Sequence, residues 1–385
     1  VVGGGVQGLW VARSAVLAGL TVGLVEARVC GAGASGGLLG ALMPHVATGW
    51  SEKKQFQFEA LIELEELAKT LEDETGLDTG YARCGRIMPI RAKGFLDQFE
   101  SRRSATWYHW QTPTKRFELE LLEGHAYDGW LDPACAGLGV FRDPLAARID
   151  PKGYMAALKT SIAGRCDIHE GWRFERYDPA EGRAYSAGGR DTLVAKRIVL
   201  AAGYETFALT RPLTGLDLGG GVKGQSVLLA CRMPADRPII FDDGMYIVAH
   251  SAERCAVGST TERDWSDADS VDDLINDKVA QARRLCPPLR DAEIVASWAG
   301  VRPQSAARDP IAGRLQPDGA VYIAGGGFKI TLGIAHRVAQ CLVDAIVDGQ
   351  PVSGLPVTFL PETHLEVARS RLQSAIGEAG SVPHL

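Results

Sequence analysis

The hydrophobic pattern at the start of the chain predicts a strand, a helix and a second strand in close succession. Val1-Val2 ends a buried strand, and residues 3–8 form a glycine-rich turn. An Ala-, Val- and Leu-rich helix is predicted at 9–20, with Gly19 at its C-terminal boundary. Residues 21–26 are again apolar enough for a buried strand. These segments predict a βαβ unit with a right-handed crossover.

A longer amphipathic helix is predicted after residue 50. Ser51 can serve as its N-cap, and Gly76 is a typical C-terminal stop. The apolar residues between them recur every three or four positions and therefore share one helical face. They are Phe56, Ala60, Leu64, Leu67 and Leu71.

The rest of the chain alternates between strand-like and helical patterns. Residues 81–143 predict short strands separated by turns, and we expect Trp107, Tyr108 and Trp110 in that stretch to pack in a core. Strand-like segments also dominate 221–301. Further helices are predicted at 147–158, 271–285 and 333–347, and further buried strands at 197–201 and 321–324. This order predicts two domains that are interleaved along the chain.

The composition favours a globular protein with a small-molecule partner. The chain has 385 residues, 46% of them hydrophobic, which is enough for a substantial core. Its formal net charge of -6 gives no basic surface for nucleic acid or for anionic membranes. No apolar run is long enough to span a bilayer and no signal peptide is visible, so a cytoplasmic location is expected. The oligomeric state is not predicted.

The eight cysteines lie far apart and form no C-x-x-C pair, so we expect neither a disulfide framework nor a metal site. The chain opens at Val1, inside an expected strand and without Met. A few residues are therefore expected to precede it.

Three glycines in the first turn have the spacing of a dinucleotide-binding fingerprint. Gly3-x-Gly5-x-x-Gly8 follows a strand and opens a helix, which is the context that the motif requires. The glycines permit a tight turn and close approach of a pyrophosphate, and the helix N-terminus adds N–H donors and positive potential. Glu26 ends the second strand, where an acidic side chain binds a ribose 2′-OH and disfavours NADP. The motif does not separate FAD from NAD.

Four segments together carry a more specific signal. They are the fingerprint, the loop Gly33-Ala34-Ser35-Gly36 that ends at Gly40, RIVLAAG at 197–203 and GGGFKITLG at 325–333. Over nearly the whole chain, this pattern resembles the D-amino acid oxidase superfamily, which includes glycine oxidase and sarcosine oxidase-like flavoproteins.

The resemblance implies a mixed α/β and α+β fold. A Rossmann-like FAD-binding domain is expected at 1–50, 145–215 and 303–385. An interleaved substrate-binding domain of antiparallel sheet plus helix is expected at 51–144 and 216–302.

The resemblance also implies a set of FAD contacts. Ser35 would contact the pyrophosphate, and a serine in a glycine loop suits that task by itself. The helix that starts near Thr331 can stabilise the negative charge of a reduced flavin. The expected cofactor-binding residues are Gly3, Gly5, Val6, Gly8, Glu26, Ala27, Ser35, Gly36, Gly40, Ala41, Phe174, Ala202, Gly203, Gly327, Phe328, Lys329 and Thr331.

Two cations and a tyrosine are the candidate substrate contacts. Lys329 resembles the carboxylate-binding Lys of sarcosine oxidases, and Arg302 resembles the carboxylate-binding Arg of glycine oxidases. Both favour an anionic substrate. Tyr246 resembles the family tyrosine that closes the carboxylate pocket, and a half-buried strand tyrosine without that role is an equal alternative.

Two features depart from the sarcosine oxidase pattern. Where those enzymes carry an Arg, residues 41–45 read Ala-Leu-Met-Pro-His, so Met43 or His45 is expected to face the substrate and sarcosine is not favoured. A purely structural His45 is the alternative. No Cys stands near Arg302, where sarcosine oxidases form a covalent flavin bond, so FAD is expected to be non-covalent.

The predicted activity is FAD-dependent oxidation of a small amino acid or secondary amine, of the glycine, D-amino acid or N-methyl amino acid type. Hydride would pass to flavin N5, and hydrolysis of the imine would give a keto or aldehyde product. The electron acceptor is O2 or unknown. Two alternatives stay open: a tRNA wobble-uridine modification oxidase, and a flavin-bearing subunit of a heteromeric dehydrogenase.

Overall fold

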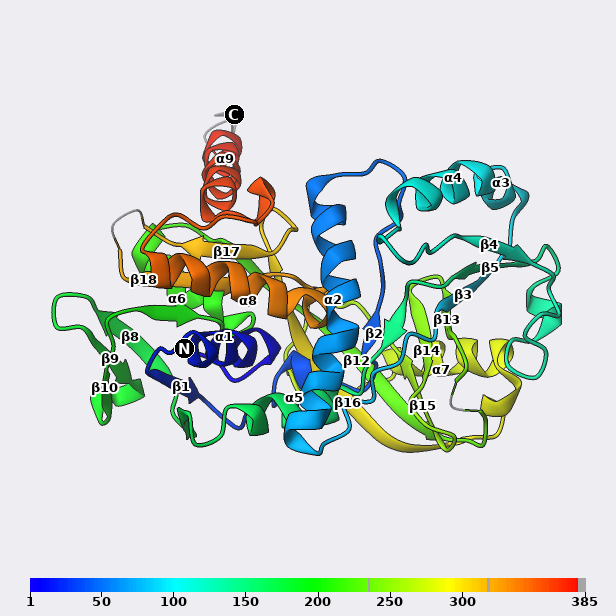
Figure 1. The fold of residues 1–385 in the computed structure, drawn as a ribbon, viewed down its shortest axis with the longest axis horizontal. Coiled ribbons are helices and arrows are strands. Elements are labelled where there is room, and N and C mark those ends of the chain that lie inside the picture. The colour runs from blue at the N-terminus through cyan, green and yellow to red at the C-terminus, as the bar shows by residue number, and fades with distance from the viewer. Residues whose placement is uncertain (235, 317–318, 380–385) are drawn as a thin grey trace, which may run out of the picture. The chain divides into compact units, whose positions relative to one another are not determined.

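The computed structural model describes residues 1–234, 236–316 and 319–379, which divide into two compact units (Figure 1). The first unit contains 1–35, 158–222 and the chain from Val301 onward, and the second contains 36–157 and 223–300. Residues 36–50 and 145–157, expected in the FAD-binding domain, pack with the second unit. Which unit holds which ligand stays a prediction.

The first unit is built on a mainly parallel sheet. β1 (Val22–Glu26) pairs in parallel with β7 (Cys166–Glu170), and β11 (Ile198–Leu200) pairs in parallel with β18 (Val321–Gly325). Val2 bridges both pairs, because it lies in parallel register with Val25 and with Leu200. β17 (Ile311–Arg314) adds an antiparallel edge beside β18. The opening βαβ unit is thereby confirmed.

Two buried helices pack together in this unit. α1 (Val6–Leu17) is buried from Val6 to Val16, and α8 (Thr331–Asp348) lies beside it (Figure 1). α1 begins three residues before the predicted start, so Gly8 lies inside the helix and the turn ends at Gly5. An antiparallel meander of three strands follows β7, and two further helices complete the unit. These elements are β8 (Phe174–Asp178), β9 (Arg183–Ser186), β10 (Thr192–Val194), α6 (Glu205–Thr214) and α9 (Pro361–Ala379).

An eight-stranded mixed sheet organises the second unit, in the order β16, β12, β15, β14, β13, β3, β5, β4. Its strands are β3 (Arg86–Pro89), β4 (Glu120–Leu122), β5 (Val140–Asp143), β12 (Gly219–Ala230), β13 (Ile239–Asp242), β14 (Met245–Ala249), β15 (Arg254–Gly258) and β16 (Glu293–Ser305). Helix α7 (Leu274–Leu285) packs on β14 and β15 and shares a buried core with Ile87, Ile240 and Val257. Because side chains alternate along a strand, the other sheet face carries a different set of residues.

The predicted amphipathic helix is confirmed as α2 (Glu52–Thr75). Ser51 is its N-cap residue, and Gly76 ends it in the left-handed conformation with φ of 69°. Four of the five predicted core positions are buried, and Leu67 is half-buried. This unit also contains a short strand pair and most of a helix that starts at a proline. They are β2 (Ala41–Leu42), β6 (Ala147–Arg148) and α5 (Pro151–Ser161).

The expectation of strands and turns throughout 81–143 is wrong for its middle part, which forms α3 (Lys93–Leu96) and α4 (Phe99–His109). Thr106 is the one buried residue of α4, so the helix has no apolar stripe to reveal its period. Trp107 and Tyr108 are 44% and 67% exposed, and only Trp110 is in a core. Neighbouring side chains on a helix point in different directions, so a run of aromatics cannot all face inward.

Candidate functional site

The glycine fingerprint forms a bare backbone cradle in the first unit. Gly3 has φ of 104°, and a Cβ on it would overlap the carbonyl oxygen of Ala201. A Cβ on Gly8 would overlap the carbonyl oxygen of Gly3, so only glycine allows α1 to start this close to the strand. A Cβ on Gly5 would lie 3.2 Å from Ser35 Oγ.

Two polar side chains close the cradle. Glu26 accepts hydrogen bonds from the N–H groups of Gly4 (2.7 Å) and Arg28 (2.9 Å), which fixes its carboxylate beside the turn. Ser35 Oγ accepts a hydrogen bond of 3.0 Å from the N–H of Val6, the first residue of α1. The fingerprint glycines, the Ser35 hydroxyl and the Glu26 carboxylate thus lie together around the N-terminus of α1. This donor and acceptor set fits the diphosphate and ribose of a dinucleotide.

The other expected cofactor residues of this unit surround the same sheet. Phe174 and Ala202 pack against the apolar cluster that contains Val2 and Val25, and Gly203 has φ of 61°. Ala27 directly follows Glu26 and is half-buried. Their contact with a cofactor stays a prediction.

A second glycine turn precedes α8. The N–H of Phe328 donates to Pro303 O (2.9 Å), and Phe328 has φ of 49°. A Cβ on Gly327 would lie 2.7 Å from Thr331 Oγ1, at the first residue of α8. The helix start is therefore closely packed against the turn.

The structure brings Arg302 and Lys329 to this turn. Arg302 Cζ lies 5.1 Å and Lys329 Nζ 5.6 Å from the centroid of the Phe328 ring. Lys329 is exposed, whereas Arg302 and Phe328 are half-buried. Both cations therefore lie near the same aromatic ring.

In the second unit, the loop after residue 35 is shaped by glycines. Gly40 has φ of 57°, and a Cβ on it would overlap the carbonyl oxygen of Ile149. A Cβ on Gly37 would lie 3.3 Å from the Trp298 ring. Half-buried His250 lies beside the same loop, and its Nε2 donates to Leu38 O over 2.7 Å. Burial lowers the pKa of His250 below the ordinary value of 6.5.

An apolar cluster joins this loop to the sheet face opposite α7. Its buried members are Leu38, Ile239, Val248 and Ala256. Ala41, Met43, Tyr246 and Trp298 pack against them. Two predicted contacts, Ala41 and Tyr246, are therefore brought together with Met43, and Gly36 lies at the start of the same loop.

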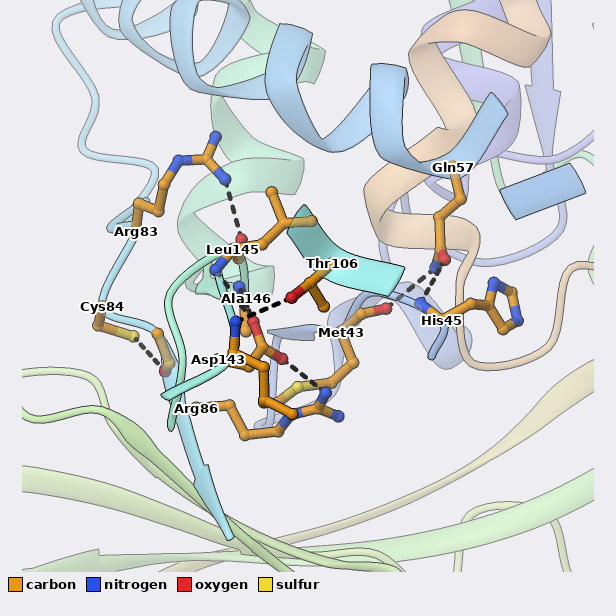
Figure 2. Close-up of polar contacts among 12 residues, drawn as sticks. Met43, His45, Gln57, Arg83, Cys84, Arg86, Thr106, Asp143, Leu145 and Ala146 are labelled. Carbon is orange, nitrogen blue, oxygen red and sulfur yellow. Dashed lines mark hydrogen bonds and ion pairs between the residues drawn. The ribbon is translucent and has the colours of Figure 1, made fainter. Parts of the chain in front are cut away.

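Gln57 on α2 holds the segment that carries Met43 and His45 (Figure 2). Its Oε1 accepts from the N–H of His45 (2.8 Å), and its Nε2 donates to Met43 O (3.0 Å). The side chain is buried, at 3% exposure. We did not predict this residue, although a glutamine between two phenylalanines on the buried helix face was a visible signal.

Figure 2 also shows a buried ion pair that the sequence reading missed. Arg86 Nη2 lies 2.5 Å from Asp143 Oδ2, and Asp143 is completely buried. Both residues occur within apolar strand sequences, which is the signal that could have identified them. Among the described residues, no group of His, Cys, Asp and Glu is placed to hold a metal ion. No helix in the described ranges is both long and apolar enough to cross a membrane.

The fold and the cradle fit a dinucleotide-binding protein, and comparison with known proteins specifies the family. Residues 1–341 match the family model described as DAO, FAD-dependent oxidoreductase. The chain therefore belongs to the DAO family of FAD-dependent oxidoreductases. The D-amino acid oxidase resemblance and the FAD assignment are confirmed.

A glycine oxidase of Pseudomonas aeruginosa is 29% identical over 387 residues, which cover 95% of this chain and 98% of that protein. The structure of glycine oxidase from Geobacillus kaustophilus matches with a TM-score of 0.82 and 24% identity, over 93% of this chain and 96% of that one. The structure of iminodiacetate oxidase from a Chelativorans species matches with a TM-score of 0.80 and 20% identity, over 94% and 98% of the two chains. These structural matches support the predicted fold class.

Proposed function

We propose that this chain oxidises a small amino acid or secondary amine that carries a carboxylate, with glycine as the first candidate. The observation that carries this proposal is that Arg302 and Lys329 both lie near the Phe328 ring, just before α8. Cationic side chains are the usual protein ligands of a substrate carboxylate. The glycine oxidase relatives support the same substrate class.

FAD is proposed to be held through its diphosphate and ribose by Gly3, Gly5, Gly8, Glu26 and Ser35. The chemistry that bound FAD would supply is acceptance of a hydride from the carbon that carries the substrate amine. The chain's own task is to bind and orient the substrate. Arg302 and Lys329 would bind its carboxylate, Tyr246 would add a hydroxyl contact, and His45 or Met43 would limit its side chain.

Anaerobic mixing of the purified holoprotein with glycine, sarcosine, D-alanine and iminodiacetate tests the activity. We expect glycine to bleach the visible flavin band faster than sarcosine does. If none of the four compounds reduces the flavin, the proposed substrate class is wrong.

The Lys329→Met and Arg302→Met variants test the carboxylate site. Each should raise KM for glycine by about 10- to 100-fold, the effect of losing one charged hydrogen bond, and should change flavin content far less. Lys152→Met, at an exposed lysine of α5, is the matched control and should behave like the wild type. An unchanged KM in both site variants would show that neither cation contacts the substrate.

We further propose that FAD is non-covalent, because the cysteines nearest in sequence to Arg302 are Cys286 and Cys341. Acid precipitation should then release all the flavin into the supernatant. A cytoplasmic location and O2 as acceptor complete the proposal, and peroxide formation during turnover in air tests the acceptor. The tRNA-modifying and subunit alternatives are not favoured, since the most similar relatives are glycine oxidases and the net charge is -6.

A further inference from the structure

We propose that Arg86 is a positioning residue for Tyr246 and acts on it through the ring of Phe241. The inference rests on the proposed function, because it assigns Tyr246 a role at the substrate. It adds residues that have no expected contact with substrate or flavin. All of them lie in the second unit.

The arrangement begins at Asp143, whose carboxylate is fixed by the backbone. Its Oδ1 accepts hydrogen bonds from the N–H groups of Leu145 (2.9 Å) and Ala146 (3.0 Å). Its Oδ2 pairs with Arg86 Nη2 at 2.5 Å (Figure 2). Since Asp143 is completely buried and Arg86 is 9% exposed, water competes little with this pair. The guanidinium is therefore held in one place.

The guanidinium in turn packs on an aromatic pair. Arg86 Cζ lies 5.7 Å from the centroid of the Phe241 ring. The Phe241 and Tyr246 rings are 4.9 Å apart, tilted by 49°. The favourable geometry of both contacts restricts rotation of the Phe241 ring and, through it, of the Tyr246 ring.

Strand register explains why these side chains meet. Arg86 of β3 pairs with Ile239 of β13, and Phe241 lies two residues further along β13, on the same face. Phe241 is directly opposite Tyr246 of β14. Asp143 is directly opposite Arg86 on the other side. The four residues therefore form a continuous row across four adjacent strands, on the face opposite the α7 core.

The guanidinium group itself is needed for this role. Arg86 Nε is buried and makes no hydrogen bond to the described residues, so Asp143 and Phe241 are the contacts that orient the group. A lysine keeps the charge but cannot present a flat surface to the ring while pairing with Asp143. The effect of Arg86 on Tyr246 should therefore depend on shape as well as charge.

Steady-state kinetics with glycine test the proposal. Phe241→Leu should raise KM about fivefold, as expected for loss of one aromatic contact, with kcat and flavin content changed less than twofold. Tyr246→Phe removes only the hydroxyl and should also raise KM. In the variant that combines Phe241→Leu with Tyr246→Phe, KM should rise no further than in the worse single variant. Both changes remove the same interaction, the contact of the Tyr246 hydroxyl with the substrate. Phe99→Leu removes a ring from a different aromatic pair, Phe99 and Phe141, and is the control.

Arg86→Lys should raise KM about threefold, through the same loss of ring contact. If this variant fails to fold, Arg86→Met combined with Asp143→Asn removes both charges and keeps an acceptor for the Leu145 N–H. It should fold and show the same KM increase. An unchanged KM in Phe241→Leu, or KM effects that multiply in the double variant, would overturn the proposal.

A readout independent of activity separates this inference from the proposed function. In protein with 13C-labelled tyrosine rings, the Tyr246 signal is identified by its loss in Tyr246→Phe. That signal should shift in Phe241→Leu and in Arg86→Lys, and stay in place in Phe99→Leu. If no amine reduces the flavin but the signal shifts, the substrate assignment is wrong, and the proposal that Arg86 and Phe241 position Tyr246 is retained. If glycine is oxidised and the signal does not move, the proposal that Arg86 and Phe241 position Tyr246 is wrong.

Discussion

The dinucleotide cradle of the first unit differs in construction from one face of the sheet in the second unit. This face carries Arg86, Phe241 and Tyr246, and we call it the Tyr246 face. The cradle consists mainly of backbone that Gly3, Gly5 and Gly8 leave bare, with Glu26 and Ser35 as its polar side chains. The Tyr246 face consists of side chains: Arg86 positions Tyr246, and Gln57 holds the backbone of the nearby segment that carries Met43. A backbone site tolerates almost no added atom, whereas a side-chain site can lose one contact and keep its shape. The two regions should therefore respond differently to substitution.

The largest effect is expected from Gly8→Ala. The added methyl group would overlap the carbonyl oxygen of Gly3, and relieving that overlap should cost about 3 kcal/mol or more. The purified variant should be colourless or bind FAD at least about 100-fold more weakly. Gly137→Ala is the control, because a Cβ there meets no atom within 4 Å. A yellow Gly8→Ala protein with wild-type FAD affinity would mean that the cradle does not bind the cofactor.

On the side-chain face, Gln57→Met should have the next largest effect. It leaves the His45 N–H and the Met43 carbonyl without their present partner, which should lower the free energy of unfolding by about 2–3 kcal/mol. Urea denaturation measures this loss. Flavin content should stay near that of the wild type, in contrast to Gly8→Ala. Gln373→Met, at an exposed position on α9, should unfold like the wild type.

Glu26→Gln tests a side chain within the backbone cradle. The amide keeps the shape but lacks the charge that strengthens a hydrogen bond to a ribose hydroxyl. FAD should dissociate about tenfold more readily, equivalent to about 1.4 kcal/mol. Titration of the apoprotein with FAD measures the change, and the exposed Glu66→Gln on α2 provides the comparison. Equal Kd values for the two variants would remove Glu26 from the cofactor site.

The smallest effect concerns two histidines, half-buried His250 in the second unit and buried His364 in the first. His250 Nε2 donates to Leu38 O, and His364 Nε2 donates to Pro310 O over 3.1 Å. Burial lowers the pKa of both in the folded state. The unfolded chain, with histidine pKa near 6.5, takes up protons first, so their contribution to stability is complete above about pH 6.5 and is lost as pH falls below it.

His250→Gln and His364→Gln should each make the Tm less dependent on pH between about 5 and 7. Differential scanning calorimetry at several pH values measures this slope. A slope equal to that of the wild type would show that folding does not lower the pKa of that histidine.

The sequence predicted the cradle much better than the Tyr246 face. Glycine spacing specifies a backbone path directly, so the βαβ unit and the place of Glu26 could be read from 26 residues. The helix α2 was equally readable, because its apolar positions follow the helical period. The predicted contacts of Lys329, Arg302, Tyr246 and His45 came from a family resemblance, and their roles stay predictions.

The rest depended on long-range pairing. Arg86 and Asp143 lie more than fifty residues apart in sequence, and only the register of β3 with β5 places them opposite each other. Helix α4 was missed because its packing buries only Thr106, which leaves no periodic signal. Polar residues inside apolar segments, such as Gln57, indicate positions where a buried side chain holds another part of the chain by hydrogen bonds.

The interleaved order of the two units has a consequence for how the protein is made. Val2 joins the first sheet by bridging Leu200, and β11 then pairs with β18 at residues 321–325. A ribosome must therefore release most of the polypeptide before this sheet can be completed. Nascent chains that stop short of β18 would expose the apolar edge of β11, which makes them natural clients of chaperones.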